Sequence, residues 1–196
     1  MCDVIAGYEA AAPKLRKAYD AVCSRTLLAP VQDLLPASPA RVLDVGAGSG
    51  RDAVWFAQQG YLVHAVDPVP ALSCQNRGHP CVTWIEDRLP HLNAVTGSFD
   101  CILVLGVWQH LSEMQRQASL PRLYALLAPR GIVVLSLRHG SGHPDRPVFD
   151  IDLDHLKSQA DHHGFECAHE QGTASAQSKN RSAGVRWTWI VLKRRD

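Results

Sequence analysis

The chain has 196 residues, 46% hydrophobic and 20% charged, with a formal net charge of +1. This length favours a single domain, 1–196, built on one full core. The near-neutral charge provides no overall field for nucleic acid or acidic membranes, so we expect neither partner. No apolar run approaches ~18 residues, and the N-terminus shows no signal-peptide pattern, so we expect a cytoplasmic protein.

The cysteines and the histidine-rich loop show no metal-binding spacing. The six cysteines are scattered without a C-x-x-C pair, which suits reduced thiols that serve in packing. His139, His143 and Asp145 share one loop but have no partners at ligand spacing, so we predict no metal site.

Residues 1–36 are predicted to be helical. Apolar residues recur at helical spacing from Leu15 onwards, and Pro13 suits the first turn of a helix. Tyr8 and Tyr19 could close over a ligand, but aromatic residues of an amphipathic helix more often belong to the core. Neither is therefore named as a site residue.

Residues 41–52 read as a strand, a glycine turn and a helix start. The apolar residues Val42, Leu43 and Val45 predict a buried parallel strand, and a helix should begin near Asp52. Gly46 and Gly48 permit close approach of a ligand to the backbone, and the free N–H groups of the helix start offer donors to it. The segment is thus predicted to cradle a nucleotide.

The carboxylate of Asp44 at the strand end would repel a phosphate and hold a cationic amine or sulfonium. The third glycine of the dinucleotide fingerprint is also absent, which disfavours a nicotinamide-dependent oxidoreductase without removing it as an alternative. The pattern resembles the first motif of class I S-adenosylmethionine-dependent methyltransferases, which is matched here by Asp44, Gly46, Gly48 and Gly50.

Two further strand ends carry acids. The strand 61–66 finishes at Asp67 and Pro68, and Asp67 lies 17 residues past Gly50 (67 − 50), where a doubly wound fold places an acid against ribose hydroxyls. A third strand, 81–85, leads into a segment that resembles the adenine-edge motif of the family. This resemblance implies that Asp87, or Glu86 in its place, accepts the adenine amino proton and that Leu89 packs on the ring.

The fourth strand begins at Phe99 and is expected to face the methyl group with its carboxyl end. Leu105 and Gly106 should therefore neighbour the methionine part of the cofactor. His110, just beyond, is either a base near the acceptor or a structural histidine that bonds backbone.

A helix over 114–127, a turn at 128–131 and a fifth strand over 132–137 are predicted next. Arg138 and His139 leave that strand and should converge with His110 on the acceptor, Arg138 by binding an anionic or carbonyl-bearing group. Alternatively, Arg138 pairs with a loop acid such as Asp145, and the histidines bond backbone.

A last helix over 151–163 and alternating strands over 165–171 and 185–193 complete the chain, with a polar loop at 172–184. The resemblance implies an α/β, doubly wound, mostly parallel seven-stranded sheet with a C-terminal antiparallel strand pair and N-terminal helices over the cofactor site. We divide the chain into a helical cap (1–36), a cofactor-binding core (40–138), and a substrate loop with the last helix and strand pair (139–196).

The function that the resemblance implies is transfer of a methyl group from S-adenosylmethionine to an acceptor. The sequence at 105–108 lacks the Asn or Asp followed by Pro-Pro and an aromatic of amino-methylating DNA enzymes, which disfavours that class. In a chain of 196 residues, substrate specificity has to come from the N-terminal helices, the Arg138 loop and the 172–184 loop, which favours a small-molecule acceptor. A peptide, a modified nucleotide and a role as a non-catalytic cofactor-binding subunit stay open, as does the oligomeric state.

Overall fold

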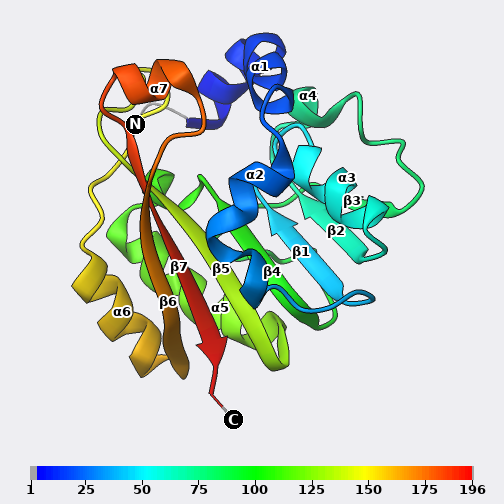
Figure 1. The fold of residues 1–196 in the computed structure, drawn as a ribbon, viewed down its shortest axis with the longest axis vertical. Helices are drawn as coiled ribbons and strands as arrows, with labels where there is room; N and C mark the ends of the chain where they lie inside the picture. Colours follow the sequence, from blue (N-terminus) through cyan, green and yellow to red (C-terminus); the bar gives the residue numbers. More distant parts are fainter. Residues whose placement is uncertain (1–3, 196) are drawn as a thin grey trace.

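The computed structural model describes residues 4–195, which form one seven-stranded sheet with helices on both faces (Figure 1). The strand order is β3-β2-β1-β4-β5-β7-β6. The strands are β1 Arg41–Val45, β2 Leu62–Val66, β3 Val82–Ile85, β4 Phe99–Leu105, β5 Leu127–His139, β6 Phe165–Ala174 and β7 Arg186–Arg194. The predicted fold class is confirmed, including the antiparallel pairing of β7 with both β5 and β6.

The strand order reverses between β1 and β4, which pair in parallel with Val45 opposite Val104. At such a switch point the connections leave in opposite directions, so a crevice opens beyond the carboxyl ends of the two strands. The glycine turn follows β1 and the segment from Gly106 follows β4, so both of these predicted elements meet at this edge.

The core lies on both faces of the sheet because residues of a buried strand alternate between them. Along β4, Cys101 and Leu103 pack on the face covered by α2, the 3-10 helix η1 and α3. Ile102 and Val104 pack on the opposite face, under α5 and α6. The covering helices are α2 Ser24–Leu28, η1 Ala29–Leu34, α3 Arg51–Gln58, α5 Glu113–Leu126 and α6 Leu153–His162.

Helix α1 (Val4–Asp20) lies across the carboxyl edge of the sheet, beside the short helix α4 (Pro70–Ser73) (Figure 1). Ala12 is buried there against Val69 and Leu72. Pro13 stands inside α1 and not in its first turn as predicted. Proline removes only one intrahelical hydrogen bond, and the flanking apolar contacts hold the helix through that position.

Two segments differ from the sequence-based prediction. The expected turn at 128–131 lies within β5, where the pairing shifts register between Phe99 and Cys101 and Arg130 has a φ of 63°. The expected loop at 172–184 begins with the end of β6 and contains the helix α7 (Ser178–Ser182). In both places the turn residues of the sequence predicted a shorter strand. Pairing with the neighbouring strands extends β5 and β6 beyond that prediction.

None of the helices within residues 4–195 is long and apolar enough to cross a membrane. The cysteines of this part of the chain are all free thiols, and Cys101 is buried in the core. Cys2 lies outside the described residues.

Candidate active site

A cavity of about 2120 Å³ opens at the carboxyl ends of β1 and β4. It extends beneath α1 and is bounded by the 141–149 loop and by the segment from Thr173 to Asn180. Pockets for a single small ligand typically measure roughly 300–1,000 Å³, so this space can accept two small molecules together.

The glycine turn forms one wall of the cavity. Gly46, Gly48 and Gly50 have φ values of 75°, 57° and 82°, a left-handed conformation that side chains rarely adopt. A Cβ on Gly48 would lie 3.5 Å from the ring of Tyr19, in the space between α1 and the turn. The strand, glycine turn and helix predicted from the sequence are therefore formed, and α1 covers the turn.

Asp67 joins the end of β2 to this turn. Its Oδ2 accepts the backbone N–H of Gly48 at 2.7 Å, and its Oδ1 accepts that of Val69 at 2.8 Å. The side chain is buried, and burial raises the pKa of Asp67 to about 6 although both hydrogen bonds lower it. Asp67 and its neighbour Pro68 both line the cavity.

Asp44 lies deeper, at the base of the turn. It is 2% exposed, and its Oδ2 has no hydrogen-bond partner among residues 4–195. Burial, reinforced by the nearby Asp52, raises the pKa of Asp44 well above its usual range. A buried carboxylate oxygen without a donor is costly, so this position favours a ligand that carries a positive charge or an N–H group.

The other predicted cofactor residues divide into two groups. Leu89, Leu105 and Gly106 line the cavity, as does Asp87, whose two oxygens accept N–H groups of its own loop, from Arg88 and Ala94. Gly50 and Glu86 are not among the lining residues. Gly50 instead caps α3, with its α-carbon turned toward the indole of Trp84.

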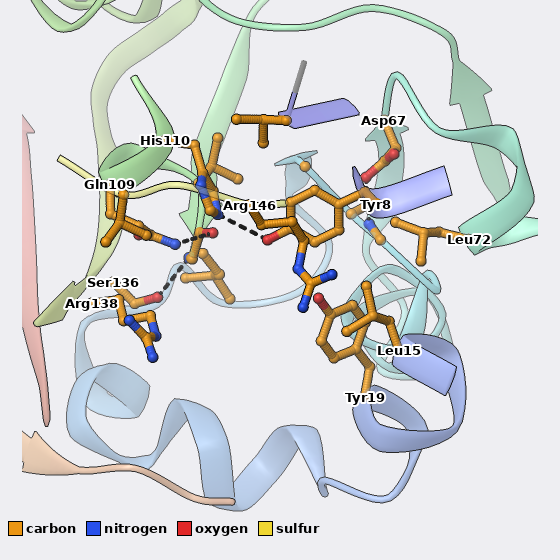
Figure 2. A pocket seen from close by; sticks show the side chains of 18 of the residues that line it. Tyr8, Leu15, Tyr19, Asp67, Leu72, Gln109, His110, Ser136, Arg138 and Arg146 are labelled. Carbon is orange, nitrogen blue, oxygen red and sulfur yellow. Dashed lines mark hydrogen bonds between the residues drawn. The ribbon is translucent and has the colours of Figure 1, made fainter. Parts of the chain in front are cut away.

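His110, at the end of the short helix Trp108–His110 (η2), is fixed on both ring nitrogens. Its Nδ1 lies 2.8 Å from the carbonyl oxygen of Pro147, and its Nε2 lies 2.8 Å from the hydroxyl of Tyr8 (Figure 2). Because a carbonyl only accepts, Nδ1 carries the proton, and Nε2 accepts from the tyrosine. Burial lowers the pKa of His110, which keeps the ring neutral.

Tyr8 reaches His110 because α1 approaches the 141–149 loop closely. Gly7 is buried, and a Cβ at this position would lie 1.9 Å from the carbonyl oxygen of Asp145. Arg146 also contacts α1, with Nη1 3.4 Å from the Gly7 carbonyl oxygen and its guanidinium 5.4 Å from the centre of the Tyr8 ring. A glycine at position 7 therefore sets the position of Tyr8.

Arg138 and His139 lie on opposite faces of β5. Arg138 lines the cavity, next to Ser136 on the same face (Figure 2). Its Nη1 donates to the carbonyl of Gly140. His139 is not among the lining residues, and its Nε2 lies 2.9 Å from the hydroxyl of Thr188. Successive strand residues point to opposite faces, so the expected convergence of both residues with His110 holds for Arg138 alone.

Several lining residues were not predicted as site residues. Tyr8 and Tyr19 carry a weak signal because aromatic residues at helical spacing usually indicate core. Arg146 lies in a loop whose path the sequence does not define. Trp187 could have been found from strand alternation, since it pairs with Arg138 and shares its face.

The model of a methyltransferase domain family matches residues 15–178, most of the chain. The chain therefore belongs to this family of methyltransferase domains. Its seven-stranded sheet with the antiparallel C-terminal pair is the fold of the class I methyltransferases.

Similar proteins include an uncharacterized methyltransferase of Mycobacterium tuberculosis, 30% identical over 50% of this chain and 40% of that protein. A glycine/sarcosine N-methyltransferase of Halorhodospira halochloris is 29% identical over 57% of this chain and 45% of its own length. The chain thus matches less than half the length of these relatives. Burkholderia thailandensis 1,6-didemethyltoxoflavin-N1-methyltransferase shares the fold, with a TM-score of 0.77, 23% identity and coverage of 98% of this chain and 87% of that one.

Proposed function

We propose that this chain transfers a methyl group from S-adenosylmethionine to a small-molecule acceptor. The observation that carries the proposal is one cavity that joins the glycine turn, Asp44 and Asp67 to the Tyr8–His110 pair. The first group suits a nucleoside with a positive charge, and the second suits removal of a proton from an acceptor. Family membership supports the same reaction.

The residues of the cavity fit the cofactor. Asp67 has acceptor capacity beyond its two backbone hydrogen bonds, so it can receive ribose hydroxyls. The unpartnered Oδ2 of Asp44 suits the ammonium group of the methionine part. Asp87 and Leu89 are assigned to the adenine edge and ring, Leu105 and Gly106 to the methionine part, and Gly46, Gly48, Gly50 and Pro68 to the shape of the cradle.

When bound, S-adenosylmethionine supplies an electrophilic methyl group on a sulfonium. The protein then has to align the acceptor and exclude water, and such alignment can contribute ~7–11 kcal/mol. The Tyr8 hydroxyl donates its proton to Nε2 of His110, so its oxygen is placed to accept a hydrogen bond from the O–H or N–H nucleophile of the acceptor. As the nucleophile loses its proton to the Tyr8 oxygen, the tyrosine proton passes to Nε2 of His110, which acts as the base. Pro147 holds the ring in the required tautomer.

A small acceptor is supported by the elements that cover the cavity. Helix α1, the 141–149 loop and α7 lie around it, so the part of the cavity left for an acceptor is bounded by three separate segments of the chain (Figure 1). The two named relatives of known activity act, by their names, on glycine or sarcosine and on 1,6-didemethyltoxoflavin. We also propose that the chain is divided into a helical cap (1–36), a cofactor-binding core (40–138) and a substrate region (139–196), as predicted from the sequence.

Turnover of S-adenosylmethionine by the full chain tests the proposed function. The full chain should convert S-adenosylmethionine to S-adenosylhomocysteine with at least one compound of a panel of metabolites, short peptides and modified nucleosides. Cofactor binding without turnover on any of them would indicate a non-catalytic subunit. Binding of a nicotinamide dinucleotide in place of S-adenosylmethionine would contradict the proposal outright.

Asp67→Ala is expected to weaken cofactor binding by about 2–3 kcal/mol, the scale for losing hydrogen bonds to a charged group. Titration calorimetry with S-adenosylhomocysteine measures the effect. Circular dichroism should show that the variant is folded, because Asp67 also holds the N–H groups of Gly48 and Val69. Unchanged affinity in a folded variant would contradict the assignment of Asp67 to the ribose.

Cofactor affinity is also expected to fall as the pH drops through about 6. The pKa of Asp67 is raised to about 6, so below this pH the carboxyl is protonated and loses acceptor capacity for ribose hydroxyls. Calorimetry between about pH 5 and pH 7 should show a steeper pH dependence for the wild type than for Asp67→Asn. Equal slopes would assign the titration to another group, such as Asp44.

A further inference from the structure

Two arginines line the cavity without an acidic partner. Arg138 donates to the carbonyl of Gly140, and Arg146 contacts the carbonyl of Gly7 and the ring of Tyr8. Neither guanidinium forms an ion pair with any residue between positions 4 and 195. Both side chains are half-buried, so each guanidinium gives up part of its hydration without a counter-charge.

Five acids line the cavity: Asp44 lies at the base of the glycine turn, and the other four are bound by other groups of the chain. Arg51 pairs with Asp52, and His143 lies 3.5 Å from Asp145. Backbone N–H groups bind both oxygens of Asp67 and of Asp87. None of the five carboxylates forms an ion pair with Arg138 or Arg146, so both cations are open to an anion from outside the chain.

Arg138 and Arg146 both act on the Tyr8–His110 pair, and they come from different elements. Arg138 lies at the end of β5, and Arg146 lies in the 141–149 loop with its guanidinium between the rings of Tyr8 and Tyr19 (Figure 2). Both lower the pKa of His110, in addition to the larger effect of burial. Two positive charges therefore lie near the Tyr8–His110 pair, with Asp67 as the acid that also acts on Tyr8, and a sulfonium methyl donor adds a third positive charge.

Aromatic side chains form the walls of the same space. Trp187 lies opposite Arg138 in the β5–β7 pairing, and its ring atom Cη2 is 3.4 Å from where a Cβ on Gly106 would stand. Trp189 also lines the cavity, opposite Ser136. Flat apolar walls with guanidinium groups at the edge favour a planar organic ion over an inorganic one.

We infer that the acceptor is a small aromatic acid. Its carboxylate or phosphate binds Arg138 and Arg146, its ring packs on Trp187, and its O–H or N–H nucleophile faces Tyr8. This inference rests on the proposed function for the nucleophile, whereas the anion site can be tested by binding alone. Guanidinium groups recognise both anions through paired charge-assisted hydrogen bonds.

The test uses three related probes: 4-hydroxybenzoate, phenyl phosphate and the neutral 4-hydroxybenzamide. Calorimetry on the full chain, saturated with S-adenosylhomocysteine, should show binding of at least one of the two acids and weaker binding of the amide. Arg138→Gln and Arg146→Gln should each reduce acid affinity at least about tenfold, because each removes charge-assisted hydrogen bonds. Affinity for S-adenosylhomocysteine should stay within about twofold of wild type.

Arg195→Gln is the matched control, since Arg195 is exposed and pairs with Asp161 away from the cavity. It should leave all affinities unchanged. Equal binding of acid and amide, no binding of either acid, or undiminished acid affinity in both cavity variants would overturn the inference. A loss of S-adenosylhomocysteine affinity with acid binding intact would assign the arginines to the cofactor carboxylate and would also overturn it.

These readouts separate the two proposals. Acid binding that depends on the arginines, in a protein that releases no S-adenosylhomocysteine in the turnover panel, would leave the anion site standing and remove the catalytic proposal. Turnover of a neutral acceptor without measurable acid binding would support the catalytic proposal and overturn the anion site.

Discussion

Gly48→Val is expected to abolish binding of S-adenosylhomocysteine while the chain stays folded. The glycine lies at the tip of the turn with a φ of 57°, and its α-carbon faces the gap beneath Tyr19. A Cβ there would lie 3.5 Å from the Tyr19 ring and 4.0 Å from the carbonyl oxygen of Gly46, both ordinary contact distances, so no buried core atom is displaced. A valine would instead fill the space that the ligand needs.

The cost to stability should come from the backbone alone. A left-handed conformation costs a non-glycine residue about 1–2 kcal/mol, which corresponds to a fall in melting temperature of roughly 2–8 °C. Gly184→Val is a matched control, because Gly184 has a φ of 72° with nothing within 4 Å and does not line the cavity. It should show a similar thermal shift and full ligand binding. Retained binding in Gly48→Val would place the ligand elsewhere.

The cofactor side of the site could be predicted because it depends on local sequence. The run from Val42 to Asp52 determines a strand, a turn and a helix through neighbouring residues. The distance from Gly50 to Asp67 is one helix and one strand, so the doubly wound connection returns Asp67 to the turn. Short-range patterns therefore carry enough information for this half.

The acceptor side depends on contacts that no local pattern encodes. Tyr8 and His110 are 102 residues apart, and their hydrogen bond exists only because α1 crosses the carboxyl edge of the sheet. The position of α1 depends in turn on the absence of a Cβ at Gly7 beside the 141–149 loop. A tyrosine on the apolar side of an amphipathic helix gives the same sequence pattern whether its side chain packs in the core or lines the site.

The placement of Arg138 and His139 shows a limit of a different kind. The sequence does indicate that both leave the fifth strand, and strand alternation already requires adjacent residues to face opposite sides. Which of the two faces the cavity follows from the register with β7, where Arg138 lies opposite Trp187. The sequence-based prediction ends the strand at Leu137, whereas β5 ends at His139. Because that prediction places Arg138 and His139 beyond the strand, the alternation is not applied to them.

His110→Ala is expected to lower turnover of the true acceptor by about 10²- to 10⁴-fold, the range for loss of a general base. The neutral imidazole presents Nε2 to Tyr8, and the Pro147 carbonyl fixes that tautomer, so no other described residue offers an equivalent base at this position. Cofactor affinity should stay near wild type, because the hydrogen bonds of the His110 ring go to Tyr8 and Pro147 and not to the glycine turn or Asp67. Steady-state kinetics together with calorimetry measure the two quantities separately.

Tyr8→Phe should also reduce turnover, and the double variant should be no slower than His110→Ala. Residues that move one proton as a unit give non-additive losses, whereas two independent contributions to packing would add. His139→Ala provides the matched histidine control, since its ring bonds Thr188 on the opposite face of β5 and should affect turnover less than about twofold. If the Tyr8 and His110 losses add, or if His139→Ala is as slow as His110→Ala, the pair does not act as the base and the proton leaves by another route.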